Sequence, residues 1–491
     1  MKTATSLRVT KDLLTLERGK DEFLLANFRD LRPLYIKTGR RYIKHLLHAV
    51  SGLETYDTIV RAFPGDKDLL DMLMEYNIIV PRESSRGADL PPADEQPGFH
   101  NKKNMSLYLL VAQSCNMRCV YCLNGKKTYQ KSRDLMMSKE VAFKSLELCL
   151  DALHPRGFLE IVFFGGEPLL NWQLVKEIIL HCENLRPKHE GKLVKYHVTS
   201  NLSLLPPDLT AWARRYNVTF LCDVDGPAEI HDRCRPFKNG RPTHSRVAGN
   251  IRRLTGEGVR VLLRTTVTSL NQDRLVDISR HHRELGAHSS AFVPVNPFNS
   301  DEDILDERLL PSVDKLIKGI SKIYKSKLWD ETNLYPFNTY APRLMSGSPT
   351  VQGCGAPYGN TPVVDVNGDV YPCIYIVGVR RFHMGNMMDG TFPDMRVLRS
   401  LYEHLHVDNT DGCKSCTWRY TCSGACPMGR LMVLDNSDVS ERTRAYCERL
   451  RCDYTRKIFE LILWERGQRA ASGILEHAET KRTGAPDIIL C

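Results

Sequence analysis

Three cysteines in the first third of the chain have the spacing of metal ligands: Cys115, Cys119 and Cys122 lie within eight residues. They directly follow a strand-like run of residues, so we expect them on the loop that leaves a strand. Three thiolates on one loop can hold three irons of a [4Fe–4S] cube and leave the fourth iron open to a small chelating ligand. Zinc is the alternative, but structural zinc sites usually take two ligands from each of two separate knuckles. The spacing favours the iron–sulfur cluster.

The Cys-x3-Cys-x2-Cys segment resembles the signature of the radical S-adenosylmethionine (SAM) superfamily, with the aromatic Tyr121 where that family contacts the adenine. The resemblance implies that the open iron chelates the amino and carboxylate groups of SAM. An electron from the cluster then cleaves SAM to methionine and a 5′-deoxyadenosyl radical, which abstracts hydrogen. The cofactor supplies this chemistry, and the protein supplies orientation and the exclusion of competing reactions.

The second predicted strand ends in a segment similar to the GGEP motif of the same family: Gly165, Gly166, Glu167 and Pro168. Two adjacent glycines allow a backbone to approach a ligand closely. The carboxylate of Glu167 can accept a hydrogen bond from an ammonium group. We therefore expect these four residues to contact SAM.

Further matches to the family follow in order, at or just after the ends of later predicted strands. The resemblance implies that Ser200 and Asn201 contact the ribose or carboxylate of SAM, and that Arg264 pairs with a carboxylate. Asp223 is also expected to contact SAM, although the family commonly has Ser at this position. Residues His231–Pro236 are similar to the family segment HDxxR.

A second set of cysteines in the last third of the chain resembles the SPASM domain, which binds two auxiliary [4Fe–4S] clusters in radical SAM peptide modifiers. The set comprises Cys354, Cys373, Cys413, Cys416, Cys422, Cys426 and Cys447. Carried over by position, the resemblance assigns auxiliary cluster II to Cys413, Cys416, Cys422 and Cys447. It assigns auxiliary cluster I to Cys354, Cys373 and Cys426. The protein would then hold three [4Fe–4S] clusters, one of which binds SAM.

Auxiliary cluster I has no fourth cysteine between Tyr358 and Pro372. Either one iron is open, where it can bind a substrate thiolate, or another group closes it. A zinc ribbon over 413–426 is the alternative, although its gaps are unusual for zinc knuckles. Of the other cysteines, Cys149 and Cys182 lie on helical patterns and are expected in the core. We predict no role for the rest, Cys222, Cys234, Cys452 and Cys491.

The cysteine loop and the GGEP segment need a scaffold that brings strand ends together, and residues 105–300 show a repeating strand–helix rhythm. The predicted strands are Ser106–Ala112, Leu159–Phe164, Lys192–Thr199, Val218–Val224, Val259–Val267 and Ser290–Val295. Most are continuous apolar runs, as in parallel strands that are covered on both faces. Six such units predict an α/β fold, a partial (β/α)6 radical SAM barrel with its chemistry at the carboxyl ends of the strands. A flat doubly wound sheet is the structural alternative.

Residues 1–82 predict a separate small domain, with a β-hairpin, three short helices and a last strand. The expected elements are Leu13–Leu16, Glu22–Ala26, Arg40–Val50, Tyr56–Phe63, Asp68–Glu75 and Ile78–Val80. This order is winged-helix-like and resembles the peptide-recognition domain of ribosomal-peptide modifying enzymes, which binds a leader peptide as an added strand. The alternatives are a DNA-binding winged helix, with Arg40, Arg41 and Lys44 on its recognition helix, and a plain packing domain.

The remaining boundaries follow from composition and pattern. Residues 83–104 read as a linker, 105–300 as the radical SAM barrel and 301–349 as a connecting helical region. Residues 350–450 carry the SPASM cysteines, and 451–491 contain the end of a closing helix, Thr443–Gln468, and a polar tail.

Charge and hydropathy narrow the class of protein. The 68 Lys and Arg against 58 Asp and Glu give a net charge of +10 without a long block of like charge, so charge does not imply nucleic acid. The polar N-terminus and the absence of a long apolar run predict neither a secretion signal nor a membrane span. We therefore predict a cytoplasmic protein, in which most of the 16 cysteines hold metal or do chemistry.

The leading hypothesis is a maturase of the sactipeptide or ranthipeptide type, which abstracts hydrogen from a ribosomally made precursor peptide and installs a Cys-derived thioether. Auxiliary cluster I would bind the thiolate or accept the leftover electron, and ferredoxin or flavodoxin would supply electrons. No catalytic acid or base is assigned. The alternatives are a carbon–carbon cross-linking maturase, an anaerobic sulfatase maturase that makes formylglycine, and a non-catalytic zinc- and DNA-binding regulator. Sulfatase maturases carry an Asp after the second auxiliary cysteine, where this chain has Ile374.

Overall fold

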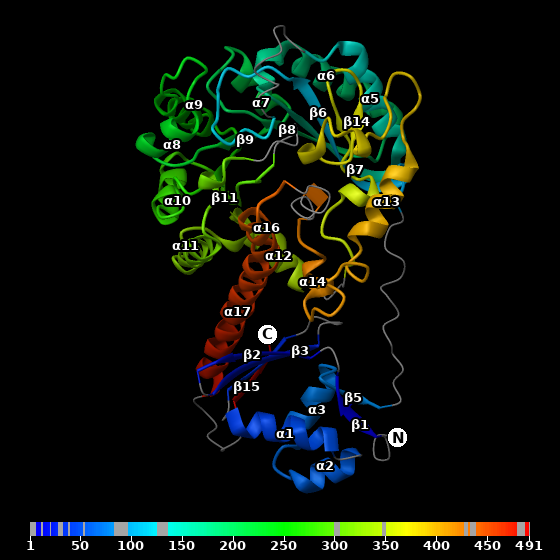
Figure 1. Cartoon of the computed structure of the whole chain (residues 1–491), viewed down its shortest axis with the longest axis vertical. Helices are drawn as coiled ribbons and strands as arrows, with labels where there is room; N and C mark the ends of the chain where they lie inside the picture. The colour runs from blue at the N-terminus through cyan, green and yellow to red at the C-terminus, as the bar shows by residue number, and fades with distance from the viewer. Residues whose placement is uncertain are drawn as a thin grey trace.

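The computed structural model describes residues 6–10, 13–19, 21–27, 33–37, 40–52, 55–82, 97–124, 136–298, 305–345, 350–426, 431–432, 438–478 and 487–490. They form a small N-terminal unit, a large α/β unit and a cysteine-rich unit (Figure 1). A long helix of the C-terminal region reaches from the α/β unit to the N-terminal unit (Figure 1).

The α/β unit is built on a nine-stranded sheet of order β12-β11-β10-β9-β8-β7-β6-β13-β14. Strands β6 to β11 follow one another across the sheet in chain order, and each pairs in parallel with the next. They are β6 (Lys102–Ala112), β7 (Leu153–Gly165), β8 (Leu193–Thr199), β9 (Thr219–Asp223), β10 (Val261–Val267) and β11 (Ser289–Pro294). All six predicted strands are present. Because the order shows no reversal, the doubly wound alternative is wrong.

Three short strands that the sequence pattern did not predict extend this sheet at its two edges. At one edge β12 (Leu334–Tyr335) pairs in parallel with β11. At the other edge β13 (Val363–Val364) pairs in parallel with β6 and antiparallel with β14 (Val370–Tyr371). The β13–β14 hairpin belongs to the cysteine-rich unit, so this unit is joined to the α/β unit through the sheet itself.

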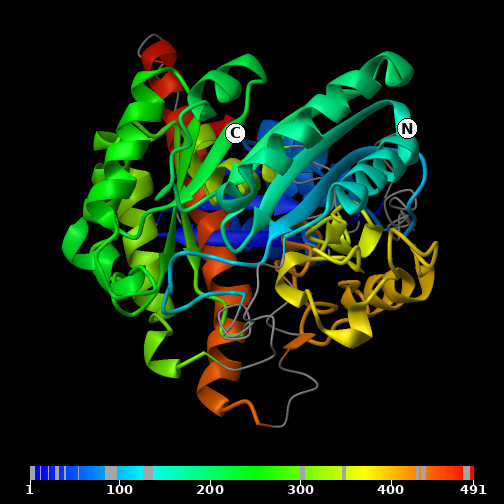
Figure 2. The same ribbon diagram turned by 90° about the horizontal axis from the view of Figure 1, so that it is seen from above.

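The helices that connect the strands lie along the outer rim of the α/β unit, with the strands inside (Figure 1). Their apolar faces form one core with the sheet, in which Leu146 of α5 and Ile178 of α6 cluster with Leu107 and Ile161. Figure 2 shows the cysteine-rich unit on the side opposite α8 to α11. The helices are α5 (Lys139–Ala152), α6 (Trp172–Leu185), α7 (Leu209–Arg215), α8 (Ala228–Cys234), α9 (His244–Gly256), α10 (Leu275–Glu284), α11 (Val313–Lys325) and α12 (Phe337–Met345).

The N-terminal unit contains the predicted elements and two further strands. Its elements are β1 (Leu7–Val9), β2 (Leu13–Arg18), β3 (Glu22–Asn27), β4 (Pro33–Lys37), α1 (Arg40–Gly52), α2 (Tyr56–Ala62), α3 (Lys67–Glu75) and β5 (Ile79–Pro81). The β2–β3 hairpin is antiparallel, and Gly19 in its turn has the positive φ of 64° that favours glycine. The unpredicted strands are β1, which pairs with β5, and β4, which pairs with β3. A distant strand, β15 (Asp487–Leu490), pairs antiparallel with the free side of β4.

The predicted linker over residues 83–104 extends too far toward the C-terminus, because strand β6 begins within it. Residues 83–96 of this linker lie outside the described residues. Strand β6 begins at Lys102, inside the predicted linker. The Lys102 ammonium is buried and donates to the carbonyl oxygen of Tyr358 at 2.7 Å. A polar sequence therefore forms a strand here because a distant carbonyl satisfies the lysine.

The cysteine-rich unit ends in a long helix with one irregular turn. The described helices are α13 (Met395–Leu405), α14 (Arg419–Cys422), α16 (Glu441–Arg449) and α17 (Thr455–Ala478), and Leu450–Tyr454 between the last two form a π-helical turn. The closing helix predicted over Thr443–Gln468 is thus present and longer at both ends. Within the described residues, no helix is long and apolar enough to cross a lipid bilayer.

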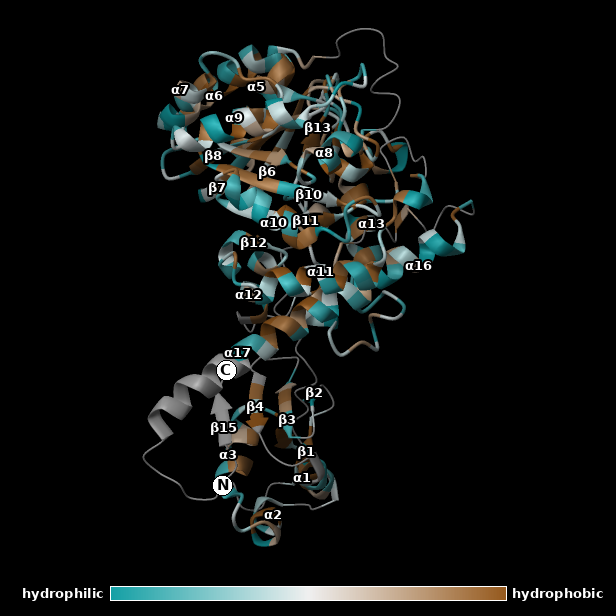
Figure 3. Ribbon diagram, turned by 90° about the vertical axis from the view of Figure 1, so that its left-hand side faces the viewer, coloured by the Kyte–Doolittle hydropathy of each residue, from teal (hydrophilic) through white to brown (hydrophobic). Residues whose placement is uncertain are grey.

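Helix α17 anchors the N-terminal sheet. Leu24 of β3 and Tyr35 of β4 belong to the same apolar cluster as Phe459 and Ile462 of α17. The rings of Tyr35 and Trp464 meet edge to face with centroids 6.4 Å apart. Figure 3 shows α17 running between the two units. The N-terminal unit is therefore held by apolar contact as well as by its covalent connection.

The carboxyl ends of β6 and β7 approach each other so closely that only glycine fits between them. A Cβ atom at Gly165, where φ is 131°, would lie 2.1 Å from the carbonyl oxygen of Ala112. One at Gly166 would lie 2.3 Å from the carbonyl oxygen of Ser114. The N–H of Gly166 and the N–H of Glu167 donate to these same two carbonyls at 2.7 and 2.9 Å. The glycines were expected to make room for a ligand; the structure shows that they make room for the backbone that leads into the Cys115 loop.

We expect Gly165→Ala to lower the free energy of unfolding by about 3 kcal/mol, because the methyl group overlaps a backbone oxygen that cannot move without moving the cysteine loop. The matched control is Gly240→Ala, where φ is also positive (78°) but nothing lies within 4 Å of a Cβ atom. This control should cost about 1 kcal/mol, from the backbone conformation alone. Urea denaturation of both variants measures the difference, and equal losses would contradict the close approach.

Candidate functional site

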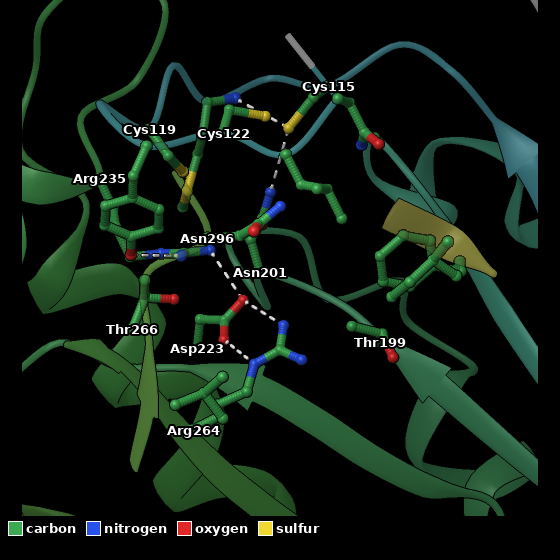
Figure 4. Close-up of a pocket in the computed structure, with 18 of the residues that line it drawn as sticks. Cys115, Cys119, Cys122, Thr199, Asn201, Asp223, Arg235, Arg264, Thr266 and Asn296 are labelled. Atoms are coloured by element: carbon green, nitrogen blue, oxygen red, sulfur yellow. Dashed lines mark hydrogen bonds and ion pairs between the residues drawn. The ribbon is translucent and has the colours of Figure 1, made fainter. Parts of the chain in front are cut away.

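The site is a cavity at the carboxyl ends of the parallel strands (Figure 4). Its wall comes from the cysteine loop, from the ends of β7 to β11 and from the cysteine-rich unit. The predicted site residues that line it are Cys115, Cys119, Tyr121, Cys122, Gly165, Gly166, Ser200, Asn201, Asp223 and Arg264. Residues spread over 150 positions of sequence thus meet in one space because parallel strands end at the same edge of a sheet.

The HDxxR-like segment holds the cysteine loop in place. The N–H of Val120 donates to the carbonyl of Cys234 at 3.0 Å, and the N–H of Arg118 donates to the carbonyl of Pro236 at 2.9 Å. The carboxylate of Asp232 accepts the N–H of Thr243 at 2.7 Å and so orders the start of α9. Residues His231–Pro236 are therefore a support for the loop, and the sequence motif is explained by this contact.

The three thiols of the loop are partly buried in the wall of the cavity. Burial raises the pKa of Cys115 to about 12. Burial also raises the pKa of Cys119, against the opposing effect of the Arg235 guanidinium. The side-chain amide of Asn201 lies 3.8 Å from the Cys115 sulfur. Thiols of this kind give up their protons on binding a metal, so metal binding here releases protons.

The residues around the loop fit an iron–sulfur cluster. Sulfur ligands on one side of a cavity suit a cluster of irons with an open position. The buried Nε atom of Arg235 has no hydrogen-bond partner in the part of the chain that the structure describes. Thiolate and sulfide sulfurs of a bound cluster are acceptors of the kind that this donor lacks. No group of three or more His, Cys, Asp or Glu side chains within the described ranges is arranged around a single metal ion.

Arg235 is the central residue that the sequence reasoning did not place in the site. Its Nη1 donates to the Tyr121 hydroxyl at 2.9 Å, and its Nη2 lies 3.4 Å from the Asp223 carboxylate (Figure 4). Its guanidinium carbon is 5.9 Å from the Tyr121 ring centroid, a cation–π distance. Arg235 is the Arg of the HDxxR-like segment. The match of that segment to the family was therefore the signal that could have placed Arg235 in the site.

Asp223 and Arg264 form a bidentate ion pair across the ends of β9 and β10. Arg264 donates through Nε and Nη2 to the two carboxylate oxygens of Asp223 at 2.6 and 3.0 Å. Burial alone would raise the pKa of Asp223, but the guanidinium groups of Arg264 and Arg235 lower it to about 2. The carboxylate expected to pair with Arg264 is therefore supplied by the chain itself. This pair also explains why an acid can stand where the family commonly has Ser.

Asp225 is a buried acid behind the Tyr121 ring. The Tyr121 hydroxyl donates to its carboxylate, and the N–H of Thr266 donates to it at 3.1 Å. Burial raises the pKa of Asp225 to about 6, although Arg235 and the Tyr121 hydrogen bond act in the opposite direction. These contacts hold the Tyr121 ring at the cavity wall, where an aromatic contact to adenine was predicted.

Glu167 and Pro168 were predicted in the site, but the structure places them behind its wall. Glu167 is fully buried, and its carboxylate accepts three hydrogen bonds. They come from the N–H of Leu169 at 3.0 Å, the hydroxyl of Ser200 at 2.8 Å and the N–H of Asn201 at 2.8 Å. Glu167 thus ties the end of β7 to the end of β8 and orients Ser200 and Asn201. The carboxylate expected to accept from an ammonium already has protein donors.

The cysteine-rich unit contributes Ile374 and Tyr375 to the cavity wall, directly after Cys373. Asn296 and Phe298, which follow β11, complete this side. No local sequence signal marked these residues, because they reach the cavity only through the packing of the two units. The cavity of the three-cysteine loop therefore borders the segment that carries Cys373, one of the SPASM-like cysteines.

The other cysteines separate by burial. Cys149, Cys182 and Cys222 are fully buried in the main core, which confirms the core prediction for the first two. The SPASM-like cysteines are partly buried or exposed, apart from Cys413, which is buried. Cys491 lies outside the described residues.

Comparison with known proteins assigns the α/β unit. The model of the radical SAM superfamily matches residues 109–281. The chain carries a radical SAM domain. This range begins in β6 and ends in α10, so it contains the cysteine loop, the glycine turn and the partly buried Asp223–Arg264 pair.

Relatives with named enzyme activities are similar to this chain at low identity. The serine-type anaerobic sulfatase-maturating enzyme of Bacteroides thetaiotaomicron is 24% identical over 66% of this chain and 83% of its own length. The radical SAM cyclopropyl synthase TigE of Paramaledivibacter caminithermalis is 24% identical over 67% of this chain and 70% of its own. Both relatives are enzymes, and this likeness together with the match to the radical SAM model shows that the present chain is an enzyme. The regulator hypothesis is not supported.

Solved structures share the fold. anSMEcpe with bound AdoMet and the Kp18Cys peptide aligns with a TM-score of 0.60 at 19% identity, over 75% of this chain and 99% of that one. SuiB of Streptococcus suis bound to the precursor peptide SuiA aligns with a TM-score of 0.50 at 14% identity, over 87% and 96%. At these identities the likeness concerns the fold.

We expect Asp223→Asn to lower the free energy of unfolding by about 2 kcal/mol, because it leaves the partly buried guanidinium of Arg264 without its closest counter-charge. Adding Arg264→Met should restore part of this loss by removing the stranded charge. The exposed pair of Asp306 with Arg308 offers the control, and Asp306→Asn should leave the stability nearly unchanged. Urea denaturation of the metal-free variants makes the comparison; a double variant no more stable than Asp223→Asn would speak against a stranded charge.

The raised pKa of Asp225 predicts a titration in the metal-free protein. Because the folded-state value of about 6 lies above the ordinary 3.8, the contribution of Asp225 to stability is complete below pH 4 and is lost as the pH rises through 6. The infrared band of a protonated carboxylic acid should be present at pH 5 and absent at pH 7. Asp225→Asn should lack this change, and a band unaffected by the substitution would assign the titration elsewhere.

Proposed function

We propose that this enzyme is a radical SAM maturase of ribosomally made peptides, which abstracts a hydrogen from a peptide carbon and joins that carbon to a cysteine sulfur. The single observation that carries the proposal is the shared cavity. Its wall holds the Cys115–Cys122 loop on one side and Ile374 and Tyr375, next to Cys373, on the other. A substrate in this space would lie between the SAM site and an auxiliary cluster.

The cofactors proposed are SAM and three [4Fe–4S] clusters. When bound at Cys115, Cys119 and Cys122, the first cluster and SAM supply a 5′-deoxyadenosyl radical that abstracts hydrogen. The chain's own contribution is orientation: Arg235 and Asp225 hold the Tyr121 ring for the adenine. Glu167 orients Ser200 and Asn201, which are proposed to contact the ribose or carboxylate of SAM. The remaining proposed contacts are Gly165, Gly166, Asp223 and Arg264.

The electrons of the proposed reaction balance only if a second redox centre takes part. The peptide carbon loses one hydrogen atom to the radical, and the cysteine thiol loses a proton as the carbon–sulfur bond forms. One electron remains and needs an acceptor, which an auxiliary cluster held by the SPASM-like cysteines would be. Ferredoxin or flavodoxin would return electrons to the first cluster. The proposed domain limits are those expected from sequence, with β6 taken to start at Lys102.

The N-terminal unit is proposed to bind the leader segment of the precursor. Its sheet already takes up one distant segment by strand addition, since the chain's own β15 pairs with β4 over Asp487–Leu490, and β2 forms the opposite edge. Main-chain hydrogen bonds give such strand addition its affinity, and side-chain pockets give it specificity. The bound precursor in the SuiB structure belongs to a protein of similar fold and makes a peptide substrate a reasonable expectation here.

Sulfatase maturation is the second candidate, favoured by similarity to the Bacteroides thetaiotaomicron enzyme and by the fold of anSMEcpe. The residue after Cys373 bears on this second candidate, because sulfatase maturases carry an Asp at that position as a base. This chain has Ile374, whose side chain cannot take a proton, and Tyr375 follows it in the cavity wall. We therefore favour peptide maturation over sulfatase maturation. A carbon–carbon cross-link differs only in using no cysteine of the peptide.

The test is a reaction of the anaerobically reconstituted full chain with SAM, a reductant and the cysteine-containing peptides encoded beside its gene. We expect formation of 5′-deoxyadenosine, loss of two hydrogens from the peptide for each link, and loss of the free thiol. A peptide that loses its sulfur would indicate formylglycine, and a Cys→Ser peptide that is still linked would indicate a carbon–carbon bond. The variant with Cys115, Cys119 and Cys122 all changed to Ala is the control and should form no 5′-deoxyadenosine.

A further inference from the structure

A strongly basic stretch of the chain lies next to the cysteine loop. Residues 233–256 contain seven Arg or Lys and no Asp or Glu, whereas the 58 Asp and Glu of the whole chain nearly balance its 68 Lys and Arg. The stretch covers the end of α8 and nearly all of α9, on the outer rim of the α/β unit (Figure 1). Arg235 is buried in the site, and six charges are exposed, on Arg233, Lys238, Arg241, Arg246, Arg252 and Arg253.

The two acids that flank this stretch do not neutralise it. Asp232 accepts two backbone N–H groups at the start of α9, each at 2.7 Å. Glu257 lies 3.0 Å from Arg253, with which it forms an ion pair. In the part of the chain that the structure describes, no carboxylate pairs with Arg241 or Arg246. The face that carries these two arginines is therefore positively charged.

The basic stretch is joined to the backbone of the cysteine loop. Phe237 and Met117 form an antiparallel bridge, and the N–H of Lys238 donates to the carbonyl of Asn116 at 3.1 Å. The N–H of Phe237 donates to the carbonyl of Arg241 at 3.0 Å, which closes a turn over 237–241. The charges of this turn are thus held at a fixed place beside the three cysteines.

A surface hollow opens between this turn and α9. Phe237, Arg241 and Arg246 are among the residues that line it. The guanidinium of Arg246 lies over the Phe237 ring, 5.7 Å from its centroid, which gives this arginine a preferred position. Asn250, also in the lining, donates to the carbonyl of Leu202 at 2.8 Å and ties α9 to the chain just after β8.

Side chains of the cysteine loop alternate between the cavity and the solvent. Met117, Cys119 and Tyr121 line the cavity, whereas Arg118 and Val120 do not line it and are exposed. Val120 is 41% exposed, which is unusual for a large apolar side chain of this protein. Because the loop runs alongside residues 234–238, these two side chains lie in the same part of the surface as the basic turn. An apolar spot with a polar, arginine-rich surround is typical of a protein interface.

The position of this surface favours an electron donor over other acidic partners. A cluster on the cysteine loop has to receive an electron before SAM is cleaved, and electron transfer slows steeply with distance. A donor must therefore approach the loop from a side that the cavity does not occupy, where Val120 is exposed. Electron-transfer complexes bury small areas, and charge complementarity speeds their encounter. A small apolar spot with several arginines suits such a complex.

We infer that a small acidic electron-transfer protein docks on the surface formed by Arg118, Val120, Phe237, Arg241 and Arg246. This inference rests on the proposed function, because it takes the cysteine loop to hold the first cluster. In the transfer, the docked protein loses one electron and the cluster gains it, and no bond is made or broken. Carboxylates of the donor meet the arginines, which brings its redox group close to Val120.

The first test measures binding of an oxidised acidic ferredoxin to the reconstituted full chain by surface plasmon resonance. Arg241→Glu combined with Arg246→Glu should weaken the affinity at low salt by about tenfold or more, because repulsion replaces attraction. Added salt should weaken binding to the unmodified chain and reduce the difference. An affinity that the double substitution leaves unchanged would overturn the inference.

The matched control is Arg214→Glu combined with Arg215→Glu at the end of α7. It makes the same change of charge, and Arg215 lies over the Tyr216 ring at 5.3 Å, as Arg246 lies over Phe237. Helix α7 leads into the amino end of β9, at the opposite edge of the sheet from the cysteine loop. The control should bind ferredoxin nearly as well as the unmodified chain. Equal weakening in both variants would show attraction by net charge alone and would overturn the inference.

Formation of 5′-deoxyadenosine separates this inference from the proposed function. With dithionite, both double variants should match the unmodified chain, because a small reductant does not need the docking surface. With reduced ferredoxin below saturation, the variant at Arg241 and Arg246 alone should be slower, by about tenfold. No 5′-deoxyadenosine from the unmodified chain with dithionite would contradict the proposed function, while the binding measurement would still decide the docking surface. Normal ferredoxin binding with lost affinity for the precursor peptide or for RNA would assign the surface to that partner and overturn the inference.

Discussion

The contact between the ends of β6 and β7 is the constraint from which the site follows. Two carbonyl oxygens, of Ala112 and Ser114, occupy the positions where side chains at Gly165 and Gly166 would stand. The same oxygens accept hydrogen bonds from the next two N–H groups. This pairing sets where β6 stops and where the cysteine loop starts. Any shift of one strand would carry the three-cysteine loop with it, so the position of the loop is fixed by the sheet.

Buried charge stabilises the other wall of the cavity. Two acids, Asp223 and Asp225, face two guanidinium groups, Arg235 and Arg264, and all four are largely removed from water. The acids differ in electrostatic environment, since Asp223 has two guanidinium neighbours and a lowered pKa, whereas burial dominates at Asp225. Removing one partner of such a network lowers the stability of the fold, because it leaves the opposite charge unpaired. It also positions Tyr121, because Arg235 and Asp225 both bond the phenol.

The cysteine-rich unit is linked to the rest of the molecule at three places. Its β13–β14 hairpin extends the central sheet, Tyr375 reaches the cavity, and its last helix continues into the N-terminal sheet. Substrate recognition at one end and radical chemistry at the other would therefore share a continuous scaffold. The π-helical turn lies in the middle of that connection, and its Arg451 lies 3.9 Å from the sulfur of Cys413.

Sequence alone determined what depends on local pattern. Apolar runs of strand length predicted all six parallel strands, and the spacing of Cys115, Cys119 and Cys122 predicted a cluster loop. Short strands such as β12 and β13 escaped prediction because two residues carry no periodicity, and β6 was predicted to begin too late because the partner of Lys102 is a distant carbonyl. Only the tertiary structure decided that Glu167 lies behind the wall, that Arg235 belongs to the site and that Ile374 and Tyr375 border the cavity. These are relations between side chains far apart in sequence, and they are settled by how helices and strands pack, which residue spacing does not encode.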